Sequence, residues 1–197
     1  MPLKIQRAVL DLIIQATGGR IESKTPDWLM RPGSIECGKQ WPLVCEIYRE
    51  LTGLELREVM PMKEWRKVDG ILKCGSSDER IVEVDESQHF NHYRGMTLRR
   101  YPKELRLAFD RETWIDHSRA EPRQKSGKWA APKPPLFPNA GGRHLQRAFR
   151  DALADILPPE YGFQPTLRIA DFEVKPWIGT ESARKWMDDL LNRKIPK

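Results

Sequence analysis

Cysteine is scarce in this sequence of 197 residues, which contains only Cys37, Cys45 and Cys74. An odd number of cysteines without a C-x-x-C pair argues against a disulfide framework and against a structural zinc site. A reducing compartment is the simplest setting for such a chain, so we expect the protein to be cytoplasmic.

Long uncharged apolar runs are also lacking. The first apolar stretch, within residues 1–19, is interrupted by Gln6, Arg7, Asp11 and Gln15. It is therefore expected to be neither a signal peptide nor a membrane span, and we predict no membrane partner.

The composition fits one globular domain over residues 1–197. Hydrophobic residues make up 39% of the chain, charged residues 31%, and the formal net charge is +6. A chain of this length buries a substantial core. Its positive surplus is compatible with a polyanionic partner, although such a surplus is common among soluble proteins.

Apolar residues recur at helical spacing in four segments, and glycine or proline follows the first three of them. The pattern predicts helices over 4–17, 42–53, 143–157 and 182–192. We expect the last helix to dock through Trp186, Leu190 and Met187. A further helix is expected from Tyr93 or Met96, kinked or divided at Pro102.

Alternating apolar and polar residues indicate strands. They predict a β-hairpin over 67–74 and 80–85, a third strand over 105–109 and an edge strand over 166–174. The chain between 110 and 142 is expected to be an irregular connection, basic and proline-rich over 117–141. The predicted class is thus α/β (α+β), a mixed central sheet flanked by helices, with a core at about 43–110 completed by 143–174.

The predicted hairpin carries three acidic residues. Residues two apart in a strand share a face, so Glu83 and Asp85 should point together while Val82 and Val84 point into a core. Asp69 lies in the other arm, where aspartate is unfavourable without a specific reason. Paired carboxylates of this kind suit a hard divalent cation, Mg²⁺ or Mn²⁺.

This stretch resembles the core of the PD-(D/E)xK restriction-endonuclease-like superfamily. The resemblance implies that Asp69 and Glu83, on adjacent strands, hold magnesium for phosphodiester cleavage. Asp85 occupies the place of the family's lysine.

The segment EVDESQHF, residues 83–90, is similar to a turn in the very-short-patch repair and EDxHD branch. There a helix glutamate, a strand aspartate and a downstream histidine form the site. The resemblance, which covers about residues 43–93, places His89 in the histidine role and, by its distance along the chain from Asp69, Glu46 (with Glu50 next) in the glutamate role. Gln88 would orient water or phosphate, and His89 would act as general base or stabilise the leaving group.

Three functions follow as alternatives. The first is a magnesium-dependent DNA endonuclease. The second is a catalytically inactive nucleic-acid-binding module on the same fold, and the third is a protein-interaction domain; a homodimer is left open. In the first two, basic residues neutralise phosphates. The candidates are Arg94, Arg99, Arg100, Lys125, Lys128 and Arg143.

Each motif also has a purely structural interpretation. The acidic hairpin and its Gln88-His89 turn would then be a solvated edge, and Glu46 and Glu50 would pair with surface Lys or Arg.

Overall fold

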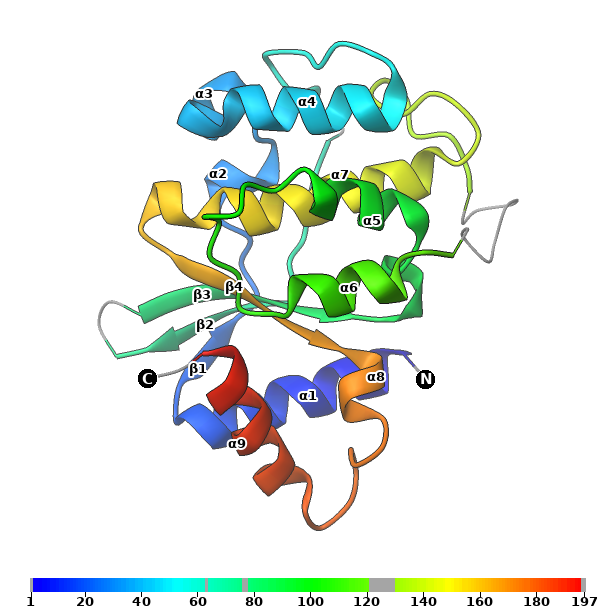
Figure 1. The fold of residues 1–197 in the computed structure, drawn as a ribbon. Coiled ribbons are helices and arrows are strands. Elements are labelled where there is room, and N and C mark those ends of the chain that lie inside the picture. Colours follow the sequence, from blue (N-terminus) through cyan, green and yellow to red (C-terminus); the bar gives the residue numbers. More distant parts are fainter. Residues whose placement is uncertain (1, 63, 76–77, 121–129, 196–197) are drawn as a thin grey trace.

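A mixed four-stranded sheet forms the centre of the molecule (Figure 1). The computed structural model describes residues 2–62, 64–75, 78–120 and 130–195. The strands lie in chain order and comprise β1 (Arg20–Glu22), β2 (Gly70–Cys74), β3 (Asp78–Asp85) and β4 (Gln164–Ala170). The first three are antiparallel neighbours, whereas β4 runs parallel to β3.

One face of the sheet is covered by helices from the two ends of the chain (Figure 1). They are α1 (Pro2–Thr17), α8 (Asp171–Val174) and α9 (Ala183–Lys194). Val9 and Ile13 of α1 and Met187 of α9 are fully buried in one apolar cluster with Val82 and Val84 of β3.

The opposite face is covered by α7, with further helices stacked beyond it (Figure 1). These helices are α4 (Trp41–Thr52), α5 (His92–Arg99), α6 (Arg111–His117) and α7 (Gly142–Ile156). Short turns complete the layer: α2 (Asp27–Met30), α3 (Ser34–Cys37), η1 (Gly38–Gln40), η2 (Ser87–His89) and η4 (Pro158–Tyr161). The predicted α/β class, a mixed sheet flanked by helices, is confirmed.

The long predicted helices and the hairpin are confirmed. The apolar stripe of α4 is buried at Val44, Ile47 and Tyr48, and Gly53 ends the helix in the left-handed region with φ 71°. A residue without Cβ adopts that conformation at little cost. The helix expected near Tyr93 is α5, which begins after Asn91, whose side chain accepts from the Tyr93 N–H, and ends before Pro102.

The third predicted strand is wrong. Residues 105–109 form only an isolated bridge, between Ala108 and Leu167. The following irregular connection also contains a helix, α6, which begins where the Asp110 carboxylate accepts a hydrogen bond from the Thr113 N–H. A local capping interaction thus starts a helix in a segment without apolar periodicity.

The end of the last predicted strand is also wrong. β4 stops at Ala170, and residues 171–174 form α8, with the Glu173 carboxylate accepting from the Ala170 N–H. In α9, Met187 and Leu190 are buried as expected, but Trp186 is 47% exposed and does not dock. The helices built from the described residues include none with the length and apolar character needed to cross a membrane.

Candidate functional site

Glu83 and Asp85 lie on the face of β3 that is covered by α7. They are 6% and 0% exposed, and the neighbouring Val82 and Val84 pack on the other side of the strand. The predicted alternation is therefore confirmed. Both faces of β3 are buried, so these two acids need partners inside the protein.

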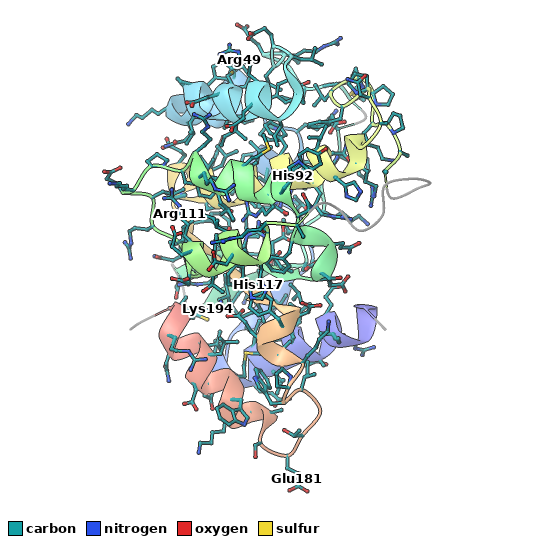
Figure 2. All side chains as sticks on the ribbon, turned by 45° about the vertical axis from the view of Figure 1, so that its right-hand side comes forward. Arg49, His92, Arg111, His117, Glu181 and Lys194 are labelled. Atoms are coloured by element: carbon teal, nitrogen blue, oxygen red, sulfur yellow. The ribbon has the colours of Figure 1, made fainter. Side chains whose placement is uncertain are left out.

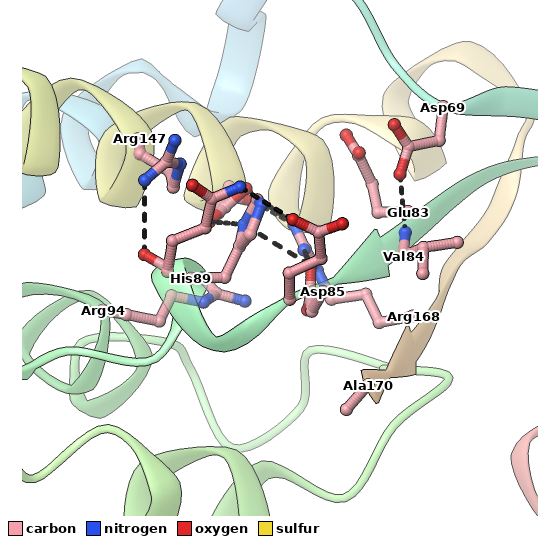
Figure 3. A network of polar contacts seen from close by, with 12 residues as sticks. Asp69, Glu83, Val84, Asp85, His89, Arg94, Arg147, Arg168 and Ala170 are labelled. Carbon is pink, nitrogen blue, oxygen red and sulfur yellow. Dashed lines mark hydrogen bonds and ion pairs between the residues drawn. The ribbon is translucent and has the colours of Figure 1, made fainter. Parts of the chain in front are cut away.

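Asp69 lies near Glu83. The last ladder pair at this end of the hairpin joins Gly70 to Val82, and Asp69 and Glu83 are the residues that come next in the two segments. Figure 3 shows the two side chains close together at this end of the hairpin. Asp69 directly precedes β2, and its Oδ2 accepts from the Val84 N–H at 2.8 Å. This bond gives the aspartate a structural reason to stand beside a strand.

A helix side chain also reaches Asp69, but it comes from α1. Gln6 Nε2 donates to Asp69 Oδ1 at 2.7 Å. Both carboxylate oxygens of Asp69 are therefore oriented. Burial raises the pKa of Asp69, and the hydrogen bond from Val84 partly offsets this effect.

Glu83 is the more strongly perturbed acid. Burial raises the pKa of Glu83 to about 7, Arg66 opposes the rise, and the neighbouring Asp69 adds to it. Arg66 Nη2 donates to Glu83 Oε1 at 2.6 Å, and both side chains are almost completely buried. A buried carboxylate crowded by another is a group that a cation would stabilise.

A basic cavity of about 130 Å³ adjoins this pair. Six of the lining residues can carry positive charge: Arg66, Lys67, His89, Arg143, Arg147 and Arg150. The other three are the acids Glu83 and Asp151 and the amide Gln146. Positions 143, 147, 150 and 151 recur at helical spacing, so α7 presents them as one stripe. Such a lining favours an anion.

His89 is held at the edge of the cavity by Asp151. Its Nδ1 lies 2.9 Å from Asp151 Oδ2 and 3.6 Å from Asp85 Oδ1. Burial lowers the pKa of His89, but these two carboxylates outweigh burial and the net shift is upward. The pKa of Asp151 is lowered by His89 and Arg168 despite its burial. Asp151 is therefore ionised and accepts from His89 Nδ1–H.

Behind His89, a buried charge cluster joins β3, β4, α5 and α7. Arg168 Nη1 donates to Asp85 at 2.6 Å and its Nε donates to Asp155 at 2.7 Å (Figure 3 labels Asp85 and Arg168). Arg94 Nη2 also donates to Asp155, at 2.6 Å. We call the set Asp85, Arg94, Asp151, Asp155 and Arg168 the charge cluster. Asp85 has both oxygens occupied, since Trp114 Nε1 donates to the second at 2.9 Å.

Two sequence predictions are wrong in this geometry. Arg94 is 1% exposed and bound to Asp155, so it is not available to a phosphate. Glu46 is on the outer helix α4, where Arg49 points away from the sheet (Figure 2). It pairs with Arg100 Nη1 at 3.0 Å, and Glu50 binds the same guanidinium. The structural interpretation, in which Glu46 and Glu50 pair with a surface arginine, therefore holds, and Arg100 is occupied.

The other predicted residues fall into separate places. Arg143 lines the cavity, whereas Arg99 is exposed at the end of α5. The Gln88 side-chain amide donates to the Glu86 carboxylate at 3.0 Å, and the Gln88 backbone carbonyl accepts from Arg147. Lys125 and Lys128 lie outside the described residues.

Sequence reasoning did not find several residues at the site. They are Gln6, Arg66, Lys67, Arg147, Arg150 and Asp151. The spacing of the arginines along α7 was the one available signal, because it marks a polar stripe. Arg66 and Gln6 reach the site only through the tertiary fold.

The acids do not form a complete protein cage for a metal. Within the described ranges, the His, Cys, Asp and Glu side chains provide no group of three or more that could hold a metal ion. Any cation at Asp69 and Glu83 would therefore take its remaining ligands from water or from a bound phosphate.

Together, fold and site define an α/β protein with paired carboxylates beside a basic cavity. The chain belongs to a family of unknown function (DUF7255), whose model matches residues 46–193. No curated protein and no solved structure matches it. Helix α1, which supplies Gln6, lies outside the matched range.

Glu83 should make stability depend on pH. Its pKa is raised from 4.5 to about 7, so between these pH values the folded state binds the additional proton and the free energy of unfolding falls as pH rises. The fall corresponds to about 3 kcal/mol. His89, whose pKa is also raised, loses its contribution as pH rises further. We expect Glu83→Gln to remove most of the fall when urea unfolding is compared at pH 4.5 and 7.5. An unchanged fall in the variant would contradict the assignment to Glu83.

Proposed function

We propose that the protein hydrolyses phosphodiester bonds in DNA, using Mg²⁺ or Mn²⁺ held by Asp69 and Glu83. The observation that supports this proposal best is the placement of these two acids near each other at the end of the hairpin, with Glu83 lining the basic cavity. The resemblance to PD-(D/E)xK nucleases assigns metal binding to the same two residues. The three cysteines are free thiols, which suits a cytoplasmic setting.

The two acids fit a magnesium ion. Mg²⁺ is commonly held by one or two carboxylates together with water and substrate phosphate oxygens, so a three-residue cage is not required. Asp69 and Glu83 crowd each other, and burial disfavours the charge on both. When bound, the ion would make a water nucleophilic and neutralise charge on the phosphate.

The protein's own side chains would bind and orient the phosphate. Arg143, Arg147 and Arg150 approach it from α7, while Arg66 and Lys67 approach from the segment before β2. Guanidinium groups donate strong, directional hydrogen bonds to phosphate oxygens. The buried Arg66 Nε has no hydrogen-bond partner among the described residues, so it has a donor left for an anion.

His89 is suited to proton transfer. Because Asp151 accepts from Nδ1–H, Nε2 is the nitrogen that exchanges a proton with the cavity. The raised pKa of His89 favours its protonated form, which donates to a leaving oxygen. Asp151 would thus position His89 and stabilise its charge.

A non-catalytic nucleic-acid-binding module is the second candidate. It is favoured by Asp85, which stands in the place of the motif lysine and is fully occupied by Arg168 and Trp114. In this alternative the basic cavity binds phosphate, but no phosphodiester bond is hydrolysed. Binding would then persist without a divalent cation.

Removal of the metal separates the two candidates. Purified protein is incubated with supercoiled plasmid and with single-stranded DNA in Mg²⁺, in Mn²⁺ and in EDTA. We expect cutting of at least one substrate with a divalent cation and none in EDTA. Salt-dependent binding without cutting under any condition would support the binding module. Neither cutting nor binding would contradict both.

A further inference from the structure

We propose that residues 64–68 and the basic cavity together bind single-stranded nucleic acid, with Trp65 stacking on a base next to a phosphate held in the cavity. The inference rests on the proposed function in one respect, because both place a phosphate in this cavity. It adds the class of strand that the site accepts. It also gives a role to an exposed tryptophan that the fold does not use.

Residues 64–68 have the alternating burial of extended chain. Glu64, Arg66 and Val68 are 8%, 6% and 6% exposed, whereas Trp65 is 60% exposed and Lys67 is also exposed. In extended chain, residues two apart point to the same side and lie about 7 Å from each other. Arg66 and Lys67 both line the cavity, so Trp65 projects from the segment that forms part of the cavity wall, directly next to Arg66.

The residues on either side of Trp65 are fixed to the body of the protein. Glu64 accepts hydrogen bonds from Gln146 Nε2 at 3.2 Å and from Arg150 Nη2 at 3.2 Å. Arg66 is bound to Glu83 at 2.6 Å. Both neighbours of Trp65 are thus anchored by their side chains, which lowers the entropic cost of placing the indole against a ligand.

Further apolar side chains are exposed in the neighbouring chain. Ile35, Val59 and Met62 are 87%, 77% and 77% exposed. Their segments are held together, since the Ser34 N–H donates to the Glu58 carbonyl at 2.7 Å. The protein thus offers exposed aromatic and apolar side chains on the chain before and at the cavity wall, in addition to the positive charge of the cavity. Bases and phosphates along a single strand have these same two requirements.

The geometry favours single strands over a duplex. The cavity of about 130 Å³ offers room for a phosphate group, which a single strand or a duplex could supply, so the preference for one of them comes from the base. In a duplex, the bases stack on one another and do not present their faces to an indole. A base that stacks on Trp65 must therefore come from a single-stranded region or a frayed end.

Binding measured in EDTA tests this inference without any contribution from cleavage. The probe is a fluorescein-labelled 20-residue oligothymidylate, with a labelled 20-base-pair duplex for comparison, followed by fluorescence anisotropy. We expect tighter binding of the single strand and a loss of about 5- to 100-fold in Trp65→Ala. Trp186→Ala is the matched control, because Trp186 is 47% exposed on α9, on the opposite face of the sheet, and should bind as the wild type does.

A second variant tests the phosphate contact. Lys67→Ala should reduce the slope of log affinity against log salt concentration by about 0.7, as expected for one phosphate contact on a single strand. Equal affinity for both strands, or equal binding by the Trp65 and Trp186 variants, would overturn the inference. If the protein cuts plasmid but Trp65→Ala binds the oligonucleotide as tightly as the wild type does, the inference fails and the proposed function is retained. Binding that depends on Trp65, without cutting of any substrate, would support the inference and contradict the proposed function.

Discussion

Arg168→Ala is expected to lower the free energy of unfolding by about 3 to 5 kcal/mol, because it leaves buried carboxylates without their counter-charge. Arg168 is 0% exposed and contacts Asp85 at 2.6 Å, Asp155 at 2.7 Å and Asp151 at 3.5 Å. The loss is comparable with the total stability of many domains. Urea unfolding followed by circular dichroism measures it, and failure to obtain folded protein agrees with the expectation.

The matched control is Arg49→Ala. Arg49 pairs with Glu55 at 2.8 Å, but its side chain is 57% exposed (Figure 2 labels Arg49 on α4). Exposed pairs contribute about 0 to 1 kcal/mol, so this variant should unfold almost as the wild type does. A change below 1 kcal/mol in Arg168→Ala would show that the charge cluster is not held by this guanidinium.

Asp69→Asn is expected to reduce DNA cleavage by at least about 100-fold, the loss typical of removing one charge that stabilises the reacting groups. Asparagine keeps an oxygen that can accept from the Val84 N–H, and the Gln6 amide can turn so that its oxygen accepts from the new NH2 group, so the local structure should be retained. Initial rates of plasmid nicking at saturating Mg²⁺ provide the measurement, and the thermal unfolding midpoint confirms folding.

Glu46→Gln is the control for this experiment. The sequence placed Glu46 in the site, whereas the structure pairs it with Arg100 on the surface, where it is exposed. Its cleavage rate should stay within about twofold of wild type, since surface changes have small effects. Equal losses in the two variants would contradict the assignment of the site to Asp69 and Glu83.

Local patterns predicted the part of the site that lies within one hairpin. Period-two alternation placed Glu83 and Asp85 on one face, and the hairpin brought Asp69 near Glu83. The contact from Gln6 joins residues 63 positions apart, and a glutamine within a helix gives no sign of such a partner. Glu46 was selected by its distance along the chain, a criterion that does not identify which helix packs against the end of β2.

The errors in secondary structure have a similar cause. Residues 105–109 have strand-like composition, but a strand requires a paired neighbour, and only Ala108 finds one, at Leu167. Residues 171–174 continue an alternating pattern, yet Asp171 and Glu173 are also well placed in the first turn of a helix. Here the capping interaction with the Ala170 N–H prevailed over the alternation.

The parallel pairing of β3 with β4 also determines the order in which the molecule can be assembled. Asp85 and Arg168 are 83 positions apart in the sequence. Arg168, on β4, also binds Asp155 on α7. Because β4 follows β3 and α7 in the chain, Asp85 is synthesised before Arg168, the guanidinium that neutralises it. Until β4 emerges, Asp85 must remain hydrated, because an isolated charge is not buried at an acceptable free energy. The inner strand β3 thus reaches its final, dry environment only after β4 has been made.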